Sequence, residues 1–307
     1  MLKTSSKPFL LVMILCCAMT MVHAQHTFPL TNLPAMARYQ DSLIRISDET
    51  ENAQNNQARF AANAHFIKTL VEALKTPGSF NQNFDSLKRV SVLNAPDKSF
   101  RLFTWYLPVD DGTYRYFGAI QMASKDGKLK LFPLIDTTDQ LKDPNAITTH
   151  KNWYGAYYYQ IVPVSSTGKS PCFALLGWKG NNGKTSKKVI EVLSFENGEP
   201  SFGKAIFVQP KNPGSNRMIF EYNKLNSMTL TMDKSVNMIV FDHLAPFSEE
   251  MAGNFEYYAS DLSFDAYKVT GGKLKLVENV ELKNDPNEMD ELYIDPKDKK
   301  IQAIKKL

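Results

Sequence analysis

Residues 172–198 read CFALLGWKGNNGKTSKKVIEVLSFENG, and this stretch decides the fold class. It contains two apolar or β-branched runs, Cys172–Trp178 and Lys188–Phe195. A Gly-Asn-Asn-Gly sequence at 180–183 separates the runs, and Asn197-Gly198 follows the second one. Glycine and asparagine accept the positive φ that tight hairpins require. Each turn therefore predicts that the runs on either side of it pair as antiparallel strands.

The same alternation of strand and turn continues in both directions from this stretch. Further turn signals are Asp110-Asp111-Gly112, Asp126-Gly127 and Gly271-Gly272. Between Phe100 and Val277 the pattern predicts strands at Phe100–Leu107, Tyr114–Met122, Leu129–Ile135, Tyr154–Val164, Cys172–Trp178, Lys188–Phe195, Arg217–Tyr222, Met228–Met232, Met238–Phe241, Leu262–Val269 and Lys273–Val277. Short turns between strands are typical of an antiparallel, mainly β fold.

Two features bear on how these strands are layered. The run Tyr154–Val164 is apolar or amphipathic on both faces, which predicts a strand covered on both sides. The segments Lys125–Leu131 (KDGKLKL) and Thr270–Leu276 (TGGKLKL) are near-copies of one hairpin, which indicates repetition. A sandwich and a propeller-like stack of small sheets both fit these observations.

The part of the chain before this β domain has a helical period. Phe60, Ala64, Ile67, Val71 and Leu74 recur at the spacing of one helix face, and Thr76-Pro77-Gly78 ends that pattern. An earlier apolar stripe runs from Pro34 to about residue 48. We therefore expect residues 25–98 to form a helical segment that packs on an antiparallel β domain at 99–307.

The first 24 residues have the organisation of a cleavable secretory signal peptide. Lys3 and Lys7 provide a positive start, Phe9–Met19 is an unbroken apolar run, and Val22-His23-Ala24 places compact residues at the cleavage position. The apolar run would extend about 16 Å as a helix, which is about half the thickness of a bilayer core. It is therefore too short for a permanent membrane anchor.

Two cysteines in this segment raise lipidation as an alternative. A lipoprotein signal needs a small residue directly before the modified cysteine. Here Leu15 precedes Cys16 and Cys16 precedes Cys17, so lipidation is disfavoured. The sequence thus predicts export to the periplasm or beyond, cleavage after Ala24 and no transmembrane segment in the mature chain. Only Cys172 then remains, so no disulfide can form within the mature chain.

The charge balance excludes one large class of partners. Two of the 36 Lys and Arg residues lie in the signal segment and none of the 32 Asp and Glu residues do, which leaves 34 against 32. A nucleic-acid binder would carry a clustered excess of basic residues. We therefore expect no nucleic-acid partner.

No motif in the sequence predicts a cofactor or a metal site. The glycine-rich stretch that begins at Gly177 has five residues before its Gly-Lys-Thr, where a phosphate-binding loop has four, and a strand follows it instead of a helix. The mature histidines, His26, His65, His150 and His243, are scattered with no two at the spacing of metal ligands.

The polar group best suited to catalysis is Asp242-His243 at a predicted strand end, with Asp261 and Asp265 further along the chain. Two carboxylates about 5 to 10 Å apart across a cleft can hydrolyse a glycan by acid and base catalysis. Aspartates are also common at strand ends and turns for purely structural reasons. An envelope hydrolase that uses these residues is the alternative functional hypothesis.

Aromatic residues provide the main functional indication. Trp105, Tyr106, Tyr114 and Trp178 fall in the first half of the β domain, close to Asp110 and Asp111. Exposed aromatic rings beside acids bind carbohydrates or peptides through stacking and hydrogen bonds, whereas buried rings only fill a core. We take these six residues as candidates for ligand binding.

Several strings in the chain resemble exported β-rich proteins of Bacteroidota-type bacteria whose function is uncharacterised. The strings are Pro96–Arg101, Thr104-Trp105, Asp110–Gly118, Leu175–Trp178 and Val240–Leu244, and the resemblance covers about residues 60 to 285. It implies an envelope or secreted setting and assigns no activity. The leading hypothesis is therefore a non-enzymatic, envelope-associated binding module for a glycan, a peptidoglycan fragment or a protein.

Overall fold

The computed structural model describes residues 33–165, 171–211 and 213–281. The predicted signal peptide at residues 1–24 and its cleavage point after Ala24 lie outside the described residues. Among those residues, no helix is both long enough and apolar enough to cross a bilayer.

Two helices, α1 (Leu33–Glu51) and α2 (Asn56–Lys75), form an antiparallel hairpin. The Asn55 side chain accepts a hydrogen bond from the Ala58 amide at 2.9 Å and so caps the start of α2. Gly78, in the left-handed region with φ of 77°, follows the end of this helix. The helical part is shorter than the 25–98 segment expected from the sequence, because Ser91–Asn94 forms a strand, β1.

The buried face of α2 also differs from the expected one. The helix buries Asn63, Phe66, Leu70, Ala73 and Leu74, whereas Ala64 is exposed and Ile67 and Val71 are only partly buried. The apolar stripe of the sequence is therefore offset by about one position from the face that meets the sheet. A polar residue, Asn63, occupies the core-facing position because it has a hydrogen-bonding partner there, described below.

The remaining elements form three sheets. The first has the order β1-β2-β3-β4, with β2 (Phe100–Pro108), β3 (Tyr114–Met122) and β4 (Lys130–Ile135). The second has the order β5-β9-β8-β7-β6, and β11 also pairs with β8. Its strands are β5 (Thr148–Thr149), β6 (Tyr157–Ser165), β7 (Cys172–Gly180), β8 (Thr185–Glu196), β9 (Glu199–Phe202) and β11 (Met218–Asn223).

The third sheet has the order β10-β15-β14-β13-β12. Its strands are β10 (Phe207–Val208), β12 (Leu230–Asp233), β13 (Met238–Pro246), β14 (Tyr258–Thr270) and β15 (Lys273–Val277). All pairings in the three sheets are antiparallel except that of β10 with β15. The prediction of a mainly β, antiparallel fold with a short helical segment is confirmed.

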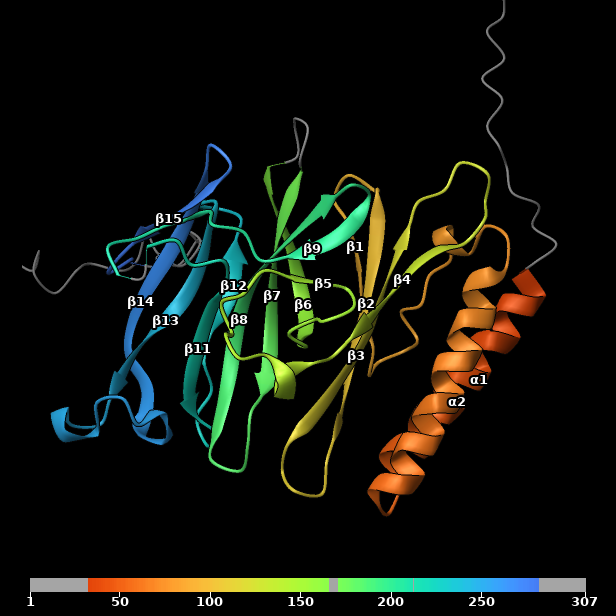
Figure 1. Ribbon diagram of the computed structural model, residues 1–307, viewed down its shortest axis with the longest axis horizontal. Coiled ribbons are helices and arrows are strands. Elements are labelled where there is room, and N and C mark those ends of the chain that lie inside the picture. The colour runs from red at the N-terminus through yellow and green to blue at the C-terminus, as the bar shows by residue number, and fades with distance from the viewer. Residues whose placement is uncertain (1–32, 166–170, 212, 282–307) are drawn as a thin grey trace, which may run out of the picture.

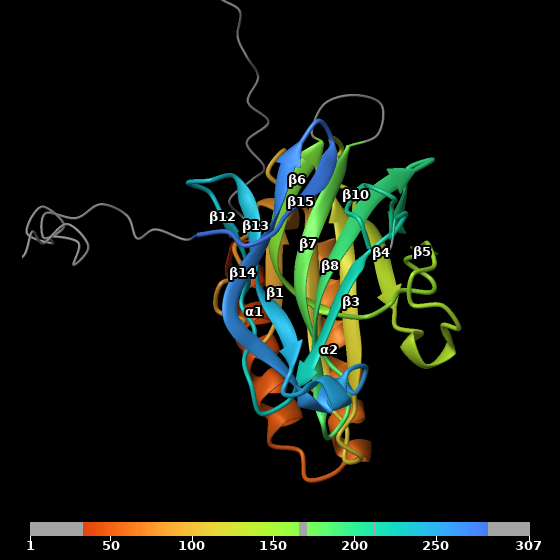
Figure 2. The same ribbon diagram turned by 90° about the vertical axis from the view of Figure 1, so that its left-hand side faces the viewer.

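The helices and sheets are stacked as layers (Figure 1). The helical hairpin covers one face of the first sheet, the second sheet lies in the middle, and the third sheet closes the far end. Figure 2 views the stack from the side of the third sheet. A separate apolar core fills each of the three gaps between successive layers. The middle sheet is therefore buried on both faces, as the sequence of the 154–164 run predicts.

Each sheet contains four consecutive strands in meander order: β1 to β4, β6 to β9 and β12 to β15. This is the organisation of propeller blades, but here the first and third sheets lie at opposite ends of an open stack (Figure 1). The two near-identical sequence segments fall on equivalent hairpins, β3–β4 in the first sheet and β14–β15 in the third. The repetition in the sequence thus corresponds to the repetition of sheets.

Candidate ligand-binding cavity

Four aromatic rings from the first two sheets meet between these sheets, near the ends of their strands. Tyr106 of β2, Tyr114 of β3, Tyr157 of β6 and Trp178 of β7 form this aromatic cluster. The Tyr106 ring centroid lies 4.9 Å from that of Trp178 and 5.7 Å from those of Tyr114 and Tyr157. Strand ends that flank hairpin turns come together at the same edge of a meander, which explains why these residues converge.

A glycine makes the close packing of this cluster possible. A Cβ atom at Gly180 would overlap the ring of Tyr114, so only a residue without a side chain fits beside it. Tyr114 and Trp178 can therefore approach to 5.1 Å between centroids, nearly perpendicular to each other at 83°. Such edge-to-face contacts are favourable for aromatic rings.

Trp105 is directed to the opposite side of β2, toward the helices. Its indole N–H donates a 2.8 Å hydrogen bond to Oδ1 of Asn63, and its ring meets Phe66 edge-to-face at 5.3 Å. Because an indole N–H can only donate, this bond fixes the orientation of the Asn63 amide. The Nδ2 group of Asn63 forms no hydrogen bond with the described residues, although Asn63 is only 3% exposed.

A cavity of about 560 Å³ lies beside these residues, between the helical hairpin and the edges of the first two sheets. Its aromatic wall consists of Phe66, Trp105, Tyr106, Tyr157, Tyr159 and Trp178. Its polar rim includes Glu51, Arg59, Asn63, Lys88 and Arg89. Concave sites with mostly apolar walls and a few placed polar groups are the usual form of a binding pocket.

The backbone of β2 is unpaired where it borders this cavity. Strand β1 pairs only with Arg101 to Thr104, so the last four residues of β2 have a strand partner only on the β3 side. The Ala95 amide bonds to the Phe100 carbonyl on the β1 side, and the Ala123 amide bonds to the Ser99 carbonyl on the β3 side. Since these directions alternate along a strand, the N–H and C=O of Tyr106 face the unpaired edge.

The charged residues of the rim are partly committed to ion pairs. Arg89 pairs with Asp48 and Glu51 of α1, and Arg59 pairs with Asp110 at 3.1 Å. The Nε of Arg59 is buried and has no hydrogen-bonding partner among the described residues. Lys88 forms no ion pair within the described part of the chain, so it is the rim cation that remains available to a ligand.

Ionisation in the aromatic wall favours neutral phenols. Burial raises the pKa of Tyr106, and the nearby Tyr114 and Tyr157 raise it further. Burial likewise raises the pKa of Tyr157. Both hydroxyls therefore stay protonated at neutral pH, and neither forms a hydrogen bond with the described residues, so both can serve a ligand as donors or acceptors.

The six predicted binding residues thus have different positions. Trp105, Tyr106 and Trp178 line the cavity, and Tyr114 supports two of them from behind. Asp110 does not line the cavity but positions a residue that does: it binds Arg59, and it also accepts a hydrogen bond from the Asn56 amide. Asp111 only caps its own turn, where hydrogen bonds from the Thr113 hydroxyl and amide lower the pKa of its carboxyl group.

The four residues of the hydrolase hypothesis line none of the cavities described here. Nδ1 of His243 lies 2.9 Å from Oδ2 of Asp265, so the fold brings these two together. In the register of β13 and β14, Asp265 is opposite Phe241 and shares its face, whereas Asp242 lies on the other face and accepts a hydrogen bond from the Thr229 amide. Asp261 accepts two hydrogen bonds from Ser263, two residues further along β14, and these bonds lower the pKa of its carboxyl group.

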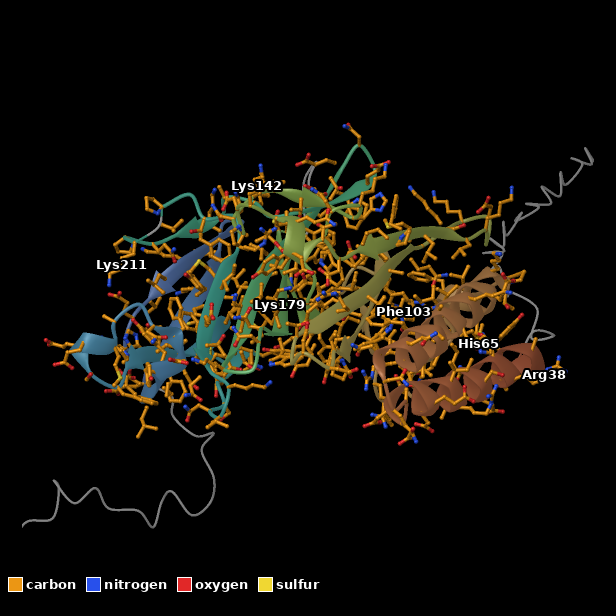
Figure 3. All side chains as sticks on the ribbon, turned by 60° about the horizontal axis from the view of Figure 1, so that its bottom comes forward. Arg38, His65, Phe103, Lys142, Lys179 and Lys211 are labelled. Atoms are coloured by element: carbon orange, nitrogen blue, oxygen red, sulfur yellow. The ribbon has the colours of Figure 1, made fainter. Side chains whose placement is uncertain are left out.

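A buried lysine forms the most strongly perturbed basic group. Lys179 lies in the middle of the β stack (Figure 3), and its Nζ donates to Oγ1 of Thr138 and to the carbonyls of Tyr154 and Gly155 at 2.8, 2.7 and 2.5 Å. Burial lowers its pKa to about 7, and the nearby Asp136 carboxylate only partly offsets this effect. It lines none of the cavities described here, which indicates a structural role.

This lysine predicts a pH dependence of stability. Its pKa is 10.5 in the unfolded chain and about 7 in the folded one, so between these values the unfolded chain holds more protons. The free energy of unfolding should then rise with pH, by up to about 1.4 kcal/mol per pH unit. Urea unfolding between about pH 7 and 8, below the ordinary thiol pKa of about 8.5, measures this slope. Lys179→Met should flatten it, and an unchanged slope in that variant would contradict the assignment.

Comparison of the chain with protein-family models, with curated proteins and with solved structures found no match. The functional argument therefore depends on the cavity itself.

Several residues of the cavity escaped prediction from the sequence. Asn63, Arg59 and Arg89 come from the helical segment, and Tyr157 and Tyr159 come from a strand whose apolar character predicted only a core role. The one available signal was Asn63, a polar residue within an apolar helix pattern. The pairing of Asn63 with Trp105, 42 residues away, depends on the tertiary packing of helix on sheet.

Proposed function

We propose that the protein is an exported, non-enzymatic binding module of the cell envelope and that the aromatic cavity holds its ligand. The proposed ligand is a short, extended segment of an envelope glycan, a peptidoglycan fragment or a protein. The observation that carries the proposal is the cavity of about 560 Å³ that Trp105, Tyr106 and Trp178 line from the edges of two sheets. Aromatic walls of this kind bind sugar rings and peptide side chains by stacking.

Two further features support an extended and non-cationic ligand. The unpaired N–H and C=O of Tyr106 can exchange two hydrogen bonds with an extended backbone, as in recognition by strand addition. Of the rim cations, Arg59 and Arg89 are held in ion pairs, whereas Lys88 has no ion pair among the described residues and favours neutral or acidic ligand groups beside it. A peptide-bearing glycan fragment would meet both the aromatic wall and the polar rim.

Binding measurements on the purified chain test this proposal. Soluble peptidoglycan fragments, neutral oligosaccharides and extended peptides are titrated while tryptophan fluorescence is recorded, because Trp105 and Trp178 line the cavity. We expect one of these classes to bind, and Trp178→Ala and Tyr106→Ala each to weaken binding about tenfold, as expected for the loss of a stacked aromatic contact.

The matched control is Phe247→Ala, which removes an aromatic ring that is 58% exposed and follows β13 of the third sheet. It should leave the affinity unchanged. The proposal fails if none of the three ligand classes binds. It also fails if Trp178→Ala and Tyr106→Ala bind the ligand as tightly as the native protein does. Analysis of the same mixtures for cleavage products tests the hydrolase alternative, which is supported only by the contact of His243 with Asp265.

A further inference from the structure

A second cavity, of about 680 Å³, lies at the opposite end of β2 from the aromatic cavity. It is enclosed by the segment 78–85 after α2, by the start of β2, and by the end of β3 with the turn that follows. Arg101 and Gln121 are buried residues in its wall, and Lys98 and Lys128 are exposed residues at its rim. None of these residues lines the aromatic cavity.

Arg101 is a buried cation whose acceptors are all neutral. Its Nε donates to Oε1 of Gln121, and its two terminal nitrogens donate to the carbonyls of Gln82 and Ser79, each at 2.8 Å. Phe84 and Phe103 lie 4.8 and 4.9 Å from the guanidinium carbon. These three bonds use three of the five N–H groups of the guanidinium, and the other two have no partner among the described residues.

The other fully buried arginine, Arg217, does have an acidic partner, which makes the absence of one at Arg101, among the described residues, notable. Arg217 is 3% exposed and its Nε lies 2.8 Å from Oε2 of the buried Glu191. Arg101 is 1% exposed, and no carboxylate of the described residues lies within ion-pair distance of it. Burial without an acid lowers the pKa of Arg101 to about 10, and at neutral pH the group still carries its charge. Buried charges in proteins are ordinarily paired.

The rim adds to this positive charge instead of compensating for it. Lys98 and Lys128 stand against one acid of the lining, Asp85, whose carboxylate already accepts a hydrogen bond from the Asn83 amide. Lys128 is exposed and lies 3.7 Å from Asp126, a pairing that water screens strongly. Together with Arg101, the lining therefore has three cations and one acid.

We propose that this second cavity is an anion-binding site, in which Arg101, Lys98 and Lys128 hold a small carboxylate or phosphate group. A planar guanidinium presents paired N–H donors that match the oxygens of either group. Gln121 holds the guanidinium in place, and its own Nε2 donates to Oγ of Ser79 at 3.0 Å. The site is independent of the proposed function, since it shares no residue with the aromatic cavity.

The experiment follows the Arg101 side chain directly. Inorganic phosphate and acetate are titrated separately into the purified chain, against chloride at equal ionic strength, while the Nε–H resonance of Arg101 is recorded by NMR. We expect saturable shifts of this resonance and of the Gln121 side-chain amide with at least one of the two anions. The anion that saturates at lower concentration identifies the preferred chemistry.

Variants of the rim avoid the risk that an Arg101 variant fails to fold. Lys98→Asn with Lys128→Gln removes both rim charges, and asparagine suits position 98 because the backbone there has a φ of 58°. We expect binding to weaken about tenfold. The control is Lys142→Gln with Lys211→Gln, which makes the same change of charge at exposed sites remote from the helices (Figure 3) and should leave affinity unchanged.

Two outcomes would overturn the proposal. One is the absence of saturation with either anion, which would leave Arg101 with the structural role of fixing segment 78–85 to the first sheet. The other is equal weakening in the rim and control variants, which would show a general effect of net charge. Neither outcome bears on the aromatic cavity, whose readout is the fluorescence of Trp105 and Trp178.

Discussion

Replacing Glu191 with alanine is expected to lower the free energy of unfolding by about 3 to 5 kcal/mol, because it leaves a buried arginine without its counter-charge. Both side chains of the Glu191–Arg217 pair are fully buried, and Nε and Oε2 are 2.8 Å apart. Arg217 also donates to the carbonyls of Pro144 and Ala146, and so fastens the segment that precedes β5 onto the second sheet. Loss of the carboxylate would weaken that attachment as well.

Urea unfolding at pH 7 measures this effect, and Glu191→Gln is the matched control. Glutamine keeps an oxygen that can accept the Arg217 Nε–H, so its loss of stability should be clearly smaller than that of alanine. If the alanine variant were within about 1 kcal/mol of the native protein, the pair would not have the structural weight assigned to it here.

The strand pairing could be predicted from the sequence wherever the turn contains residues, such as glycine or asparagine, that favour the backbone conformation of a hairpin. Asn197 and Gly198 have φ values of 52° and 80° and join β8 to β9, and Gly271 and Gly272 have φ values of 55° and 72° and join β14 to β15. These are local preferences of glycine and asparagine, which act whatever the rest of the chain does. Strand β1 is only four residues long, and although Pro96 and Asp97 in the turn before β2 are turn residues, a run this short gives no strand pattern of its own.

The order of the layers could not be derived in the same way. Alternation within β7 shows that both of its faces are apolar, but it does not show which sheet covers each face. In the structure Phe173 and Leu175 face the first sheet, whereas Cys172, Ala174 and Leu176 face the third. Which core a side chain enters depends on contacts between residues far apart in the sequence.

The residues of the candidate site likewise fall into those that local signals place and those that only tertiary packing places. Tyr106 and Tyr114 flank one hairpin turn and Trp178 precedes another, so their placement near strand ends follows from local signals. The cavity itself requires the helical hairpin to lie beside the start of β1, where Arg59, Asn63 and Arg89 complete the rim. That docking depends on the whole core between helices and sheet, and no short motif encodes it.

The three tryptophans show most clearly what the structure adds, and they lead to a second large effect. Trp153 is fully buried, donates its indole N–H to the Tyr158 hydroxyl at 3.1 Å, and packs near Phe202 between the first two sheets. Trp153→Ala should therefore lower the free energy of unfolding by about 3 to 5 kcal/mol, since it leaves a large cavity in the core and the buried Tyr158 hydroxyl without a hydrogen-bonding partner.

Trp178→Ala is the matched comparison, because it removes the same side chain at a partly buried position on the wall of the aromatic cavity. Its cost in stability should stay below about 2 kcal/mol, because less apolar area is taken from the core. The two variants should thus differ in which quantity they change: Trp153→Ala should lower the free energy of unfolding, whereas Trp178→Ala should lower the affinity for the ligand. Equal losses of stability in urea unfolding would mean that Trp178 belongs to the core, and the aromatic cavity would then lack one of its main walls.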